Sequence, residues 1–169
     1  MKIPMRTEQS KSGLVQLCAE LGKRFNIKDC ALVEIGSFAG DSAVIFAKFF
    51  KTVFCVDNWE GEIKGMKLED AFAEFKARIE PCGNVMYTRM TSKCASEIVH
   101  RIFDGVYIDA DHTYESVKQD IALWRGKVRL FVAGHDYHAK KFPGVVRAVN
   151  EAFGKPDYVA PDTSWFKIK

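Results

Sequence analysis

Two short stretches of the chain gather acidic and imidazole side chains of the kinds that bind cations and move protons. The first holds Asp109, Asp111 and His112, and the second holds His135 and Asp136. Carboxylates that converge on one place repel each other unless protons or a cation offset their charge. Oxygen-rich groups with few nitrogens suit Mg²⁺ or Mn²⁺. We therefore expect either a divalent-cation site or a hydrogen-bonded network of polar side chains without a metal.

One histidine of the first stretch has the chemistry of a general base. His112 lies three residues after Asp109, and the ordinary pKa of an imidazole, about 6.5, suits removal of a proton from a hydroxyl at neutral pH. A histidine at this place can also do no more than cap the helix that follows. The residues alone leave both interpretations open.

The segment 34–42 reads Glu-Ile-Gly-Ser-Phe-Ala-Gly-Asp-Ser, and its glycines Gly36 and Gly40 let the backbone approach a ligand closely. A dinucleotide fingerprint would also need glycine at two positions that hold Phe38 and Asp41. No lysine directly follows the glycines, as a phosphate-binding loop requires. We therefore expect a ligand without a diphosphate, or else a tight strand–helix turn that binds nothing.

A single carboxylate, Asp57, closes the next apolar run 21 residues after Gly36. A carboxylate at this place in a nucleotide-binding fold can accept hydrogen bonds from both hydroxyls of a ribose. Asn58 and Trp59 follow it, and the indole suits either stacking on a base or packing beneath a surface loop. Together with the glycine turn, this spacing favours a nucleoside-like ligand.

These residues follow short buried runs that alternate with segments of helical apolar spacing. We expect strands over 30–35, 52–57, 85–88, 103–109 and 128–133, edge strands at 158–160 and 164–168, and helices over about 8–25, 44–50, 68–79, 95–101, 117–124 and 145–153. This order predicts an α/β fold: one Rossmann-like, doubly wound, mostly parallel sheet with helices on both faces and a C-terminal antiparallel edge. Ligands bind at the carboxyl ends of such strands, where the polar residues lie.

The 169 residues suit a single domain. We expect an N-terminal helical segment at 1–28, a core at 29–155 and edge strands at 156–169. The chain is 47% hydrophobic and 28% charged, as globular domains are, and no apolar run approaches a membrane span. The first residues lack the apolar stretch of a secretory signal. We therefore expect a cytoplasmic protein without a membrane partner.

The charge and the cysteines narrow the function classes further. The net charge is +3, from 25 Lys and Arg against 22 Asp and Glu, and the basic residues are scattered. A nucleic-acid partner is not expected, because it would need a concentrated basic face. The five cysteines contain no Cys-x-x-Cys pair, so we expect reduced thiols and no zinc ribbon. The pair Phe142-Pro143 suits a contact in a homo-oligomer.

Taken together, three segments resemble the class I S-adenosylmethionine-dependent methyltransferases: Glu34–Gly40, Cys55–Asp57 and Phe103–Asp109. In that family the glycine turn lies under the methionine part of the cofactor and the acid after the second strand binds the ribose. Further residues are similar to a small subfamily that includes sugar O-methyltransferases of antibiotic pathways and cephalosporin-hydroxylase-like proteins: Ile108–Glu115, Asp120, Trp124 and Gly134–Tyr137. The similarity runs from about residue 32 to 153.

The resemblance implies roles for particular residues. The cofactor-binding set would be Glu34, Gly36, Ser37, Phe38, Gly40, Asp57, Asn58, Ser92 and Asp109. His112 would be the general base, with Asp109 as the second catalytic residue. A divalent cation such as Mg²⁺ would be held by Asp109, His135 and Asp136, although His135 stands where the sugar methyltransferases have a carboxylate.

The activity that follows from the resemblance is S-adenosylmethionine-dependent O-methylation of a small hydroxylated acceptor, with assistance from a divalent cation. Two other classes remain open. The first is a module that binds S-adenosylmethionine without catalysis. The second is a Mg²⁺-dependent, nucleotide-sugar-modifying enzyme with a Rossmann-like fold, although the missing glycines and lysine count against it.

Overall fold

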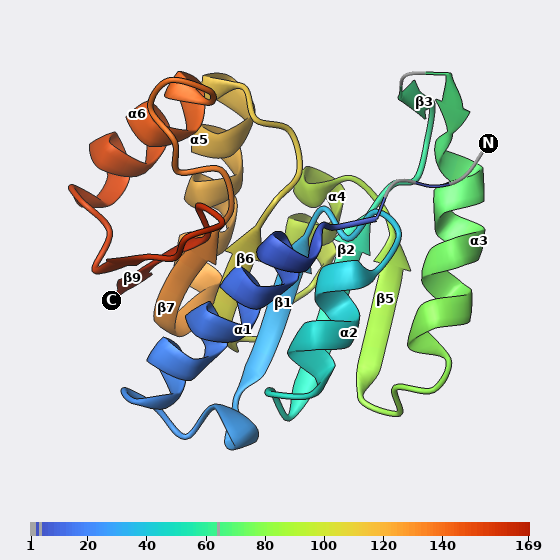
Figure 1. Ribbon diagram of the computed structural model, residues 1–169, viewed down its shortest axis with the longest axis horizontal. Helices are drawn as coiled ribbons and strands as arrows, with labels where there is room; N and C mark the ends of the chain where they lie inside the picture. Colours follow the sequence, from blue (N-terminus) through green and yellow to red (C-terminus); the bar gives the residue numbers. More distant parts are fainter. Residues whose placement is uncertain (1–2, 4, 64) are drawn as a thin grey trace.

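A seven-stranded sheet organises the chain in the computed structural model, which describes residues 3, 5–63 and 65–169 (Figure 1). Across the sheet the strands are β5 (Val85–Arg89), β2 (Thr52–Asp57), β1 (Ala31–Ile35), β6 (Phe103–Ile108), β7 (Val128–Gly134), β9 (Trp165–Ile168) and β8 (Tyr158–Val159). Neighbours from β5 to β7 pair in parallel, whereas β9 runs antiparallel to both β7 and β8. The predicted sheet, mostly parallel with an antiparallel C-terminal edge, is confirmed.

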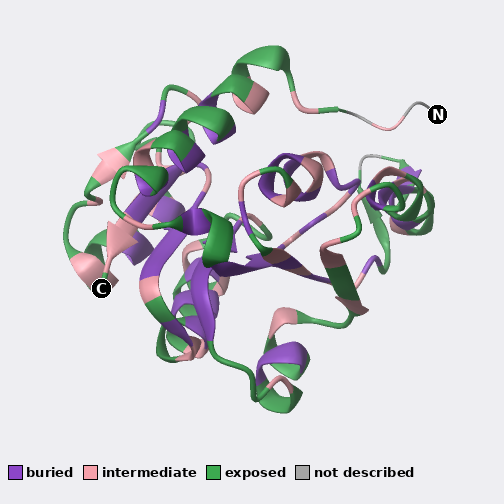
Figure 2. Cartoon of the chain, turned by 90° about the horizontal axis from the view of Figure 1, so that it is seen from below, coloured by how far each residue is buried: buried purple, intermediate pink, exposed green. Residues whose placement is uncertain are grey.

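Helices cover both faces of the sheet, as predicted (Figure 1). One face carries α1 (Glu8–Gly22), α2 (Asp41–Ala47) and α3 (Leu68–Ile79), and the other carries α4 (Ser92–Ile98), α5 (Tyr114–Trp124) and α6 (Pro143–Phe153). Short 3₁₀ turns occur at Ile27–Asp29 and Arg125–Lys127. In Figure 2 the central strands are buried between the layers, and the outward sides of the helices are exposed. The edge strands β5 and β8 contain no buried residue.

Alternation along the central strand β1 explains how one sheet supports two hydrophobic clusters. Leu32 packs with α1, α2 and α3, whereas Val33 and Ile35 pack with α4, α5 and α6. Successive strand residues point to opposite faces of the sheet. Burying apolar surface on both faces stabilises the fold by roughly 25 cal/mol for each Å² removed from water. By the same alternation, Glu34 lies on the same face as Leu32, in the apolar layer. A carboxyl group is costly to bury there unless it is hydrogen-bonded.

The structure shifts several predicted helix boundaries by a few residues and adds a hairpin. The helix expected around 95–101 is α4, which begins earlier, at Ser92, because the Thr91 hydroxyl oxygen accepts a hydrogen bond from the backbone N–H of Cys94. The predicted strands and helices leave the segment between β2 and α3 unassigned. It contains a small hairpin of β3 (Glu62–Ile63) and β4 (Met66–Lys67).

Among the described residues, no helix combines the length and apolarity needed to cross a membrane. The expectation that the chain lacks a secretory signal rests partly on residues 1, 2 and 4, which lie outside the described part of the chain. All five cysteines are free thiols.

Candidate active site

The backbone between β1 and α2 bends through two glycines in the left-handed region, with φ of +87° at Gly36 and +84° at Gly40. A Cβ atom at Gly36 would lie 2.4 Å from the carbonyl oxygen of Asp109, closer than such atoms approach in proteins. Gly40 faces the other way, and a Cβ there would lie 3.1 Å from the ring of Phe75. Because Gly36 has no side chain, the turn runs directly against the end of β6, and because Gly40 has none, the turn also packs against α3.

Glu34 lies beneath this turn and is fully buried. Its Oε2 atom accepts hydrogen bonds from the hydroxyl of Ser37 at 2.7 Å and from the thiol of Cys55 at 3.4 Å. Within the described residues, its Oε1 atom has no hydrogen-bond partner. Burial raises the pKa of Glu34 above its ordinary value, because the charged form loses its hydration. Glu34 therefore positions Ser37 from below.

Asp57, at the end of β2, ties the turn to the neighbouring loop. Its carboxylate accepts the backbone N–H of Phe38 at 2.9 Å and that of Trp59 at 3.1 Å. Both donors have positive φ, +44° at Phe38 and +49° at Trp59, which non-glycine residues adopt only when the surroundings hold them there. Each carboxylate oxygen has a second lone pair for a ligand hydroxyl.

Trp59 belongs to the core. Its side chain is buried, with ring centroids 4.7 Å from Phe72 and 4.8 Å from Phe75. The indole N–H donates to the carbonyl oxygen of Phe38 at 2.7 Å. Stacking of this ring on a bound base does not fit the structure, because both the ring and its polar atom are already engaged.

A cavity of about 940 Å³ opens at the carboxyl ends of β1, β2 and β6, the place expected for a ligand in a doubly wound sheet. Its wall includes most of the residues that the sequence predicts for a cofactor, namely Gly36, Ser37, Phe38, Asp57, Asn58, Ser92 and Asp109, and also His112. The other two predicted residues, Glu34 and Gly40, are not part of this wall.

On the side of the cavity formed by α4 and α5, Ser92 takes part in a short hydrogen-bond chain. The indole N–H of Trp124 donates to the Ser92 hydroxyl at 2.9 Å, and that hydroxyl donates to the Asp120 carboxylate at 2.5 Å. Asp120 is buried, and this burial raises its pKa to about 6, from an ordinary 3.8. The carboxylate of Asp120 was not predicted as a site residue.

This raised pKa predicts a pH-dependent stability. The folded protein holds a proton on Asp120 more tightly than the unfolded chain does, so stability falls as the pH rises from about 4 to about 6. The difference of about two pKa units amounts to about 3 kcal/mol at most. We expect Asp120→Asn to remove this fall and to be the more stable protein at pH 8, as measured by urea unfolding between pH 4 and 8. Parallel stability curves for the two proteins would contradict the prediction.

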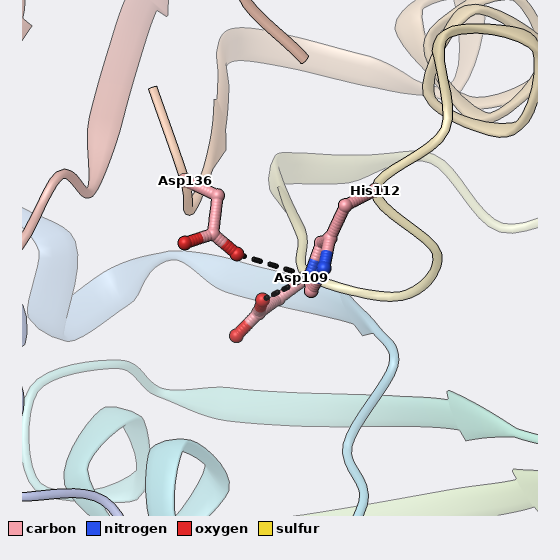
Figure 3. A group of neighbouring side chains, drawn as sticks. All are labelled: Asp109, His112 and Asp136. Atoms are coloured by element: carbon pink, nitrogen blue, oxygen red, sulfur yellow. Dashed lines mark ion pairs between the residues drawn. The ribbon is translucent and has the colours of Figure 1, made fainter. Parts of the chain in front are cut away.

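At the ends of β6 and β7, Asp109, His112 and Asp136 point toward one another (Figure 3). The Nε2 atom of His112 lies 3.0 Å from Asp136 Oδ2 and 3.7 Å from Asp109 Oδ1. Contacts with Asp109 and Asp136 raise the pKa of His112 to about 10, because two carboxylates favour the charged imidazole. In this arrangement His112 therefore carries a proton at neutral pH.

His135 contacts Asp136 from the other side. Its Nδ1 atom lies 3.0 Å from Asp136 Oδ1 and 4.0 Å from Asp109 Oδ1, and its Nε2 atom lies 3.5 Å from the carboxylate of Asp162. Burial disfavours the charged ring, but contacts with Asp136 and Asp162 outweigh it and raise the pKa of His135 to about 9. Asp162, from the turn before β9, was not predicted from the sequence.

The donor set at this place fits a divalent cation. Asp109, His112 and Asp136 can each offer one ligand atom, and these atoms lie within 4.8 Å of one another. The predicted set contains His135 in place of His112, and the distances above put both imidazoles beside the two carboxylates. The two carboxylates suit Mg²⁺ or Mn²⁺, whereas an imidazole binds a metal only in its neutral form and is more typical of Zn²⁺ or Fe²⁺.

One residue of the site, Arg6, carried no signal in the sequence. Its guanidinium pairs with Asp109, and its backbone N–H donates to Asp41 Oδ2 at 2.8 Å. Arg6 also lines the large cavity. It precedes α1 and is 103 residues away from Asp109, so neither periodicity nor motif spacing relates the two.

A second, smaller cavity of about 350 Å³ lies beside the first, between the start of α1, the loop after β7 and the turn before β9. His135 and Asp136 line it, whereas Asp109 and His112 line the larger cavity. The acid–imidazole cluster thus separates the two cavities. Phe142, which the sequence placed at an oligomer contact, lies half-buried with its ring 4.9 Å from that of His112.

Comparisons with known proteins agree with this arrangement. The sequence model of a family described as "Methyltransferase domain" matches residues 33–137, more than half of the chain. A search of the curated proteins found no match.

Several solved structures share the fold. Calicheamicin methyltransferase CalS11 superposes with a TM-score of 0.71 at 13% identity, covering 96% of this chain and 80% of that one. A ribosomal protein L11 methylase from Lactobacillus delbrueckii subsp. bulgaricus gives 0.66 at 13% identity, with 97% and 79% covered. SMU.1697c from Streptococcus mutans, solved with S-adenosylhomocysteine (SAH), gives 0.63 at 11% identity, with 96% and 97% covered.

At such low identities the structural matches establish the fold, and the family match carries the activity. The matched residues 33–137 contain the glycine turn, Asp57 and the cluster of Asp109, His112 and Asp136. The chain therefore belongs to the methyltransferase domain family and is an S-adenosylmethionine-dependent methyltransferase.

Proposed function

We propose that this enzyme methylates a hydroxyl group of a small acceptor. The observation that carries the proposal is the place of the cluster of Asp109, His112 and Asp136 between two cavities. Methyl transfer needs the donor and the acceptor on opposite sides of the travelling carbon, close to a group that manages the hydroxyl proton. The larger cavity suits the cofactor, and the smaller one suits a small acceptor.

In the proposed reaction the acceptor oxygen attacks the methyl carbon as the carbon–sulfur bond breaks, and SAH is released. The hydroxyl proton passes to Nε2 of His112. His112, whose side chain is 41% exposed, must first release to solvent the proton that Asp109 and Asp136 hold in place. A divalent cation held by Asp109 and Asp136, with His135 as a third ligand, would offset that negative charge and polarise the acceptor hydroxyl.

On the cofactor side, the proposal gives each part of the large cavity a task. The Asp57 carboxylate accepts hydrogen bonds from the ribose hydroxyls, using the lone pairs that the backbone N–H groups of Phe38 and Trp59 do not occupy. The backbone at Gly36 lies under the methionine part, and Ser92 lies at the adenine end beside Asp120. The cavity of about 940 Å³ falls within the usual range for sites of cofactor size.

The experiment is calorimetric titration of the protein with SAH, followed by a panel of small hydroxylated acceptors with methyl-labelled S-adenosylmethionine. A ligand at 100 times its Kd stabilises a protein by about 2.7 kcal/mol, so a thermal shift of a few degrees serves as a second measurement. Binding with transfer to a hydroxyl supports the proposal. Binding with no transfer to any acceptor favours a module without catalysis, and binding of nucleotide sugars in place of SAH contradicts the cofactor assignment.

Asp57→Ala tests the cofactor assignment at one position. The variant loses the acceptor of the ribose hydroxyls and of two backbone N–H groups, so we expect SAH to bind about 100-fold more weakly. The matched control is Asp70→Ala, since Asp70 is an exposed aspartate outside the cavity wall, and it should change the Kd by no more than about threefold. Equal losses in the two variants would argue against a specific role for Asp57.

A further inference from the structure

The segment before α1 places an arginine inside the large cavity. The side chain of Arg6 is only 17% exposed. Its backbone N–H donates to Asp41, and its guanidinium donates to the hydroxyl of Ser10 at 3.2 Å and to the carboxylate of Asp109. The segment is therefore anchored at both the backbone and the side chain, and the guanidinium lies beside the glycine turn.

Acidic side chains predominate around this end of the cavity. Asp41 and Asp109 are part of the wall, and Glu34 is buried beneath it. The amino-acid tail of the proposed cofactor carries an ammonium group, which carboxylates suit, and a carboxylate, which needs a cation. Among the described residues, the other cations of the wall are His112, in the proton-handling cluster, and Lys93, which comes from α4 next to Ser92.

Arg6 also has the hydrogen-bonding capacity for a second anion. A guanidinium carries five N–H donors in a planar fork that matches a carboxylate. Its contacts within the described residues are one bond each from Nη1 to Ser10 and from Nη2 to Asp109. Donors therefore remain for a carboxylate that enters the cavity above Gly36.

We propose that Arg6 binds the carboxylate of the cofactor's amino-acid tail and so selects cofactors that carry this group. The proposal rests on the proposed function, because it needs the methionine part to lie over the glycine turn. It assigns a binding role to a segment outside the family match, which begins at residue 33. The backbone bond from Arg6 to Asp41 holds the arginine in register with the start of α2.

The test compares two ligands that differ only in the carboxylate. SAH carries the complete amino-acid tail, and S-adenosyl-3-thiopropylamine keeps the ammonium group and lacks the carboxylate. We expect the wild-type protein to bind SAH about 10- to 100-fold more tightly than the amine, because charge-assisted bonds to the carboxylate are lost. In Arg6→Gln this preference should fall to about threefold or less, through weaker binding of SAH. Arg6→Lys should keep part of this preference, because lysine still attracts the carboxylate as a point charge but lacks the planar fork of the guanidinium.

Arg78→Gln is the matched control. Arg78 is also 17% exposed and pairs with Asp41 at 2.6 Å and with Glu74 at 2.7 Å, but it is not part of the cavity wall. Its loss should lower the stability of the fold and leave the preference between the two ligands unchanged. Calorimetric titration of each variant with each ligand gives the complete comparison, and a thermal melt confirms that each variant is folded.

The outcomes separate the two proposals. Equal binding of SAH and the amine by the wild-type protein overturns the role of Arg6 and leaves the cofactor assignment standing. If Arg6→Gln weakens both ligands by the same factor, Arg6 only supports Asp109 and the turn, and the role in binding is overturned. Failure of the wild-type protein to bind either ligand overturns the proposed function, and the role of Arg6 with it.

Discussion

Replacing Gly36 with alanine will abolish measurable binding of SAH and lower the free energy of unfolding by about 3 kcal/mol or more. Gly36 has a φ of +87°, which costs any other residue roughly 1–2 kcal/mol. The added Cβ would also lie 2.4 Å from the carbonyl oxygen of Asp109 and 2.6 Å from the Cα atom of Ala110. Both atoms belong to the backbone, so the turn and the end of β6 must separate, and the floor of the cofactor cavity moves with them.

Gly61→Ala is the control for backbone strain. Gly61 has a φ of +91°, but a Cβ atom there would meet nothing within 4 Å. We expect this variant to lose about 1–2 kcal/mol and to keep binding SAH. Urea unfolding and calorimetry on both variants measure the difference. If the two variants lose the same stability and both bind SAH, the close approach at Gly36 is not what shapes the cavity.

Replacing His112 with asparagine will lower kcat for methyl transfer by about 10²- to 10⁴-fold, the usual range for loss of a general base. The Nε2 atom of His112 faces Asp136 and Asp109, and His112 lines the larger cavity next to Asp136, which lines the smaller one. Asparagine keeps a polar side chain but cannot accept and release a proton at neutral pH. The Kd for SAH should change by no more than about threefold, because the residues proposed to bind the cofactor lie elsewhere in the cavity.

The measurement is initial-rate kinetics with the acceptor found by the screen, together with calorimetry for SAH. His100→Asn is the matched control, since His100 is exposed and forms no part of either cavity wall. It should leave kcat unchanged. A His112 variant with normal kcat would remove this residue from the chemistry, and a joint loss of SAH binding and rate would indicate a role in shaping the cavity.

The sheet was predictable because burial on two faces leaves a plain trace in the sequence. Runs such as 30–35 and 128–133 are apolar apart from Glu34 and Arg129, which is typical of parallel strands covered on both sides. The hairpin of β3 and β4 left no such trace, because its two-residue strands are mostly exposed. The start of α4 depended on a single hydroxyl, that of Thr91, which apolar spacing does not report.

The candidate site was predictable where spacing along the chain determines proximity. Gly36 and Asp57 lie at the ends of adjacent parallel strands, and so do Asp109 and Asp136 across β6 and β7. Arg6 could not be found in this way, because its approach to Asp109 depends on where a segment outside the sheet comes to rest.

The burial and the charge state of the site residues also could not be predicted from the sequence. Glu34 follows the glycine-turn pattern, but only the packed structure shows that it is enclosed and engaged with Ser37 and Cys55. The ordinary pKa of an imidazole makes His112 a base at neutral pH, whereas two neighbouring carboxylates raise that pKa to about 10. Such a shift depends on contacts between β6 and β7, which the residue types do not reveal.

The interior position of β9 has a consequence for the order in which the chain can fold during synthesis. β9 lies between β7 and β8 and covers the edge of β7, yet it is synthesised after both of them. Until residues 165–168 emerge, the buried strand β7 has an unpaired edge, a hazard for aggregation. The wall of the large cavity is complete by residue 120, whereas the smaller cavity needs residues 161–163. On the ribosome, the larger cavity could therefore form before the smaller one.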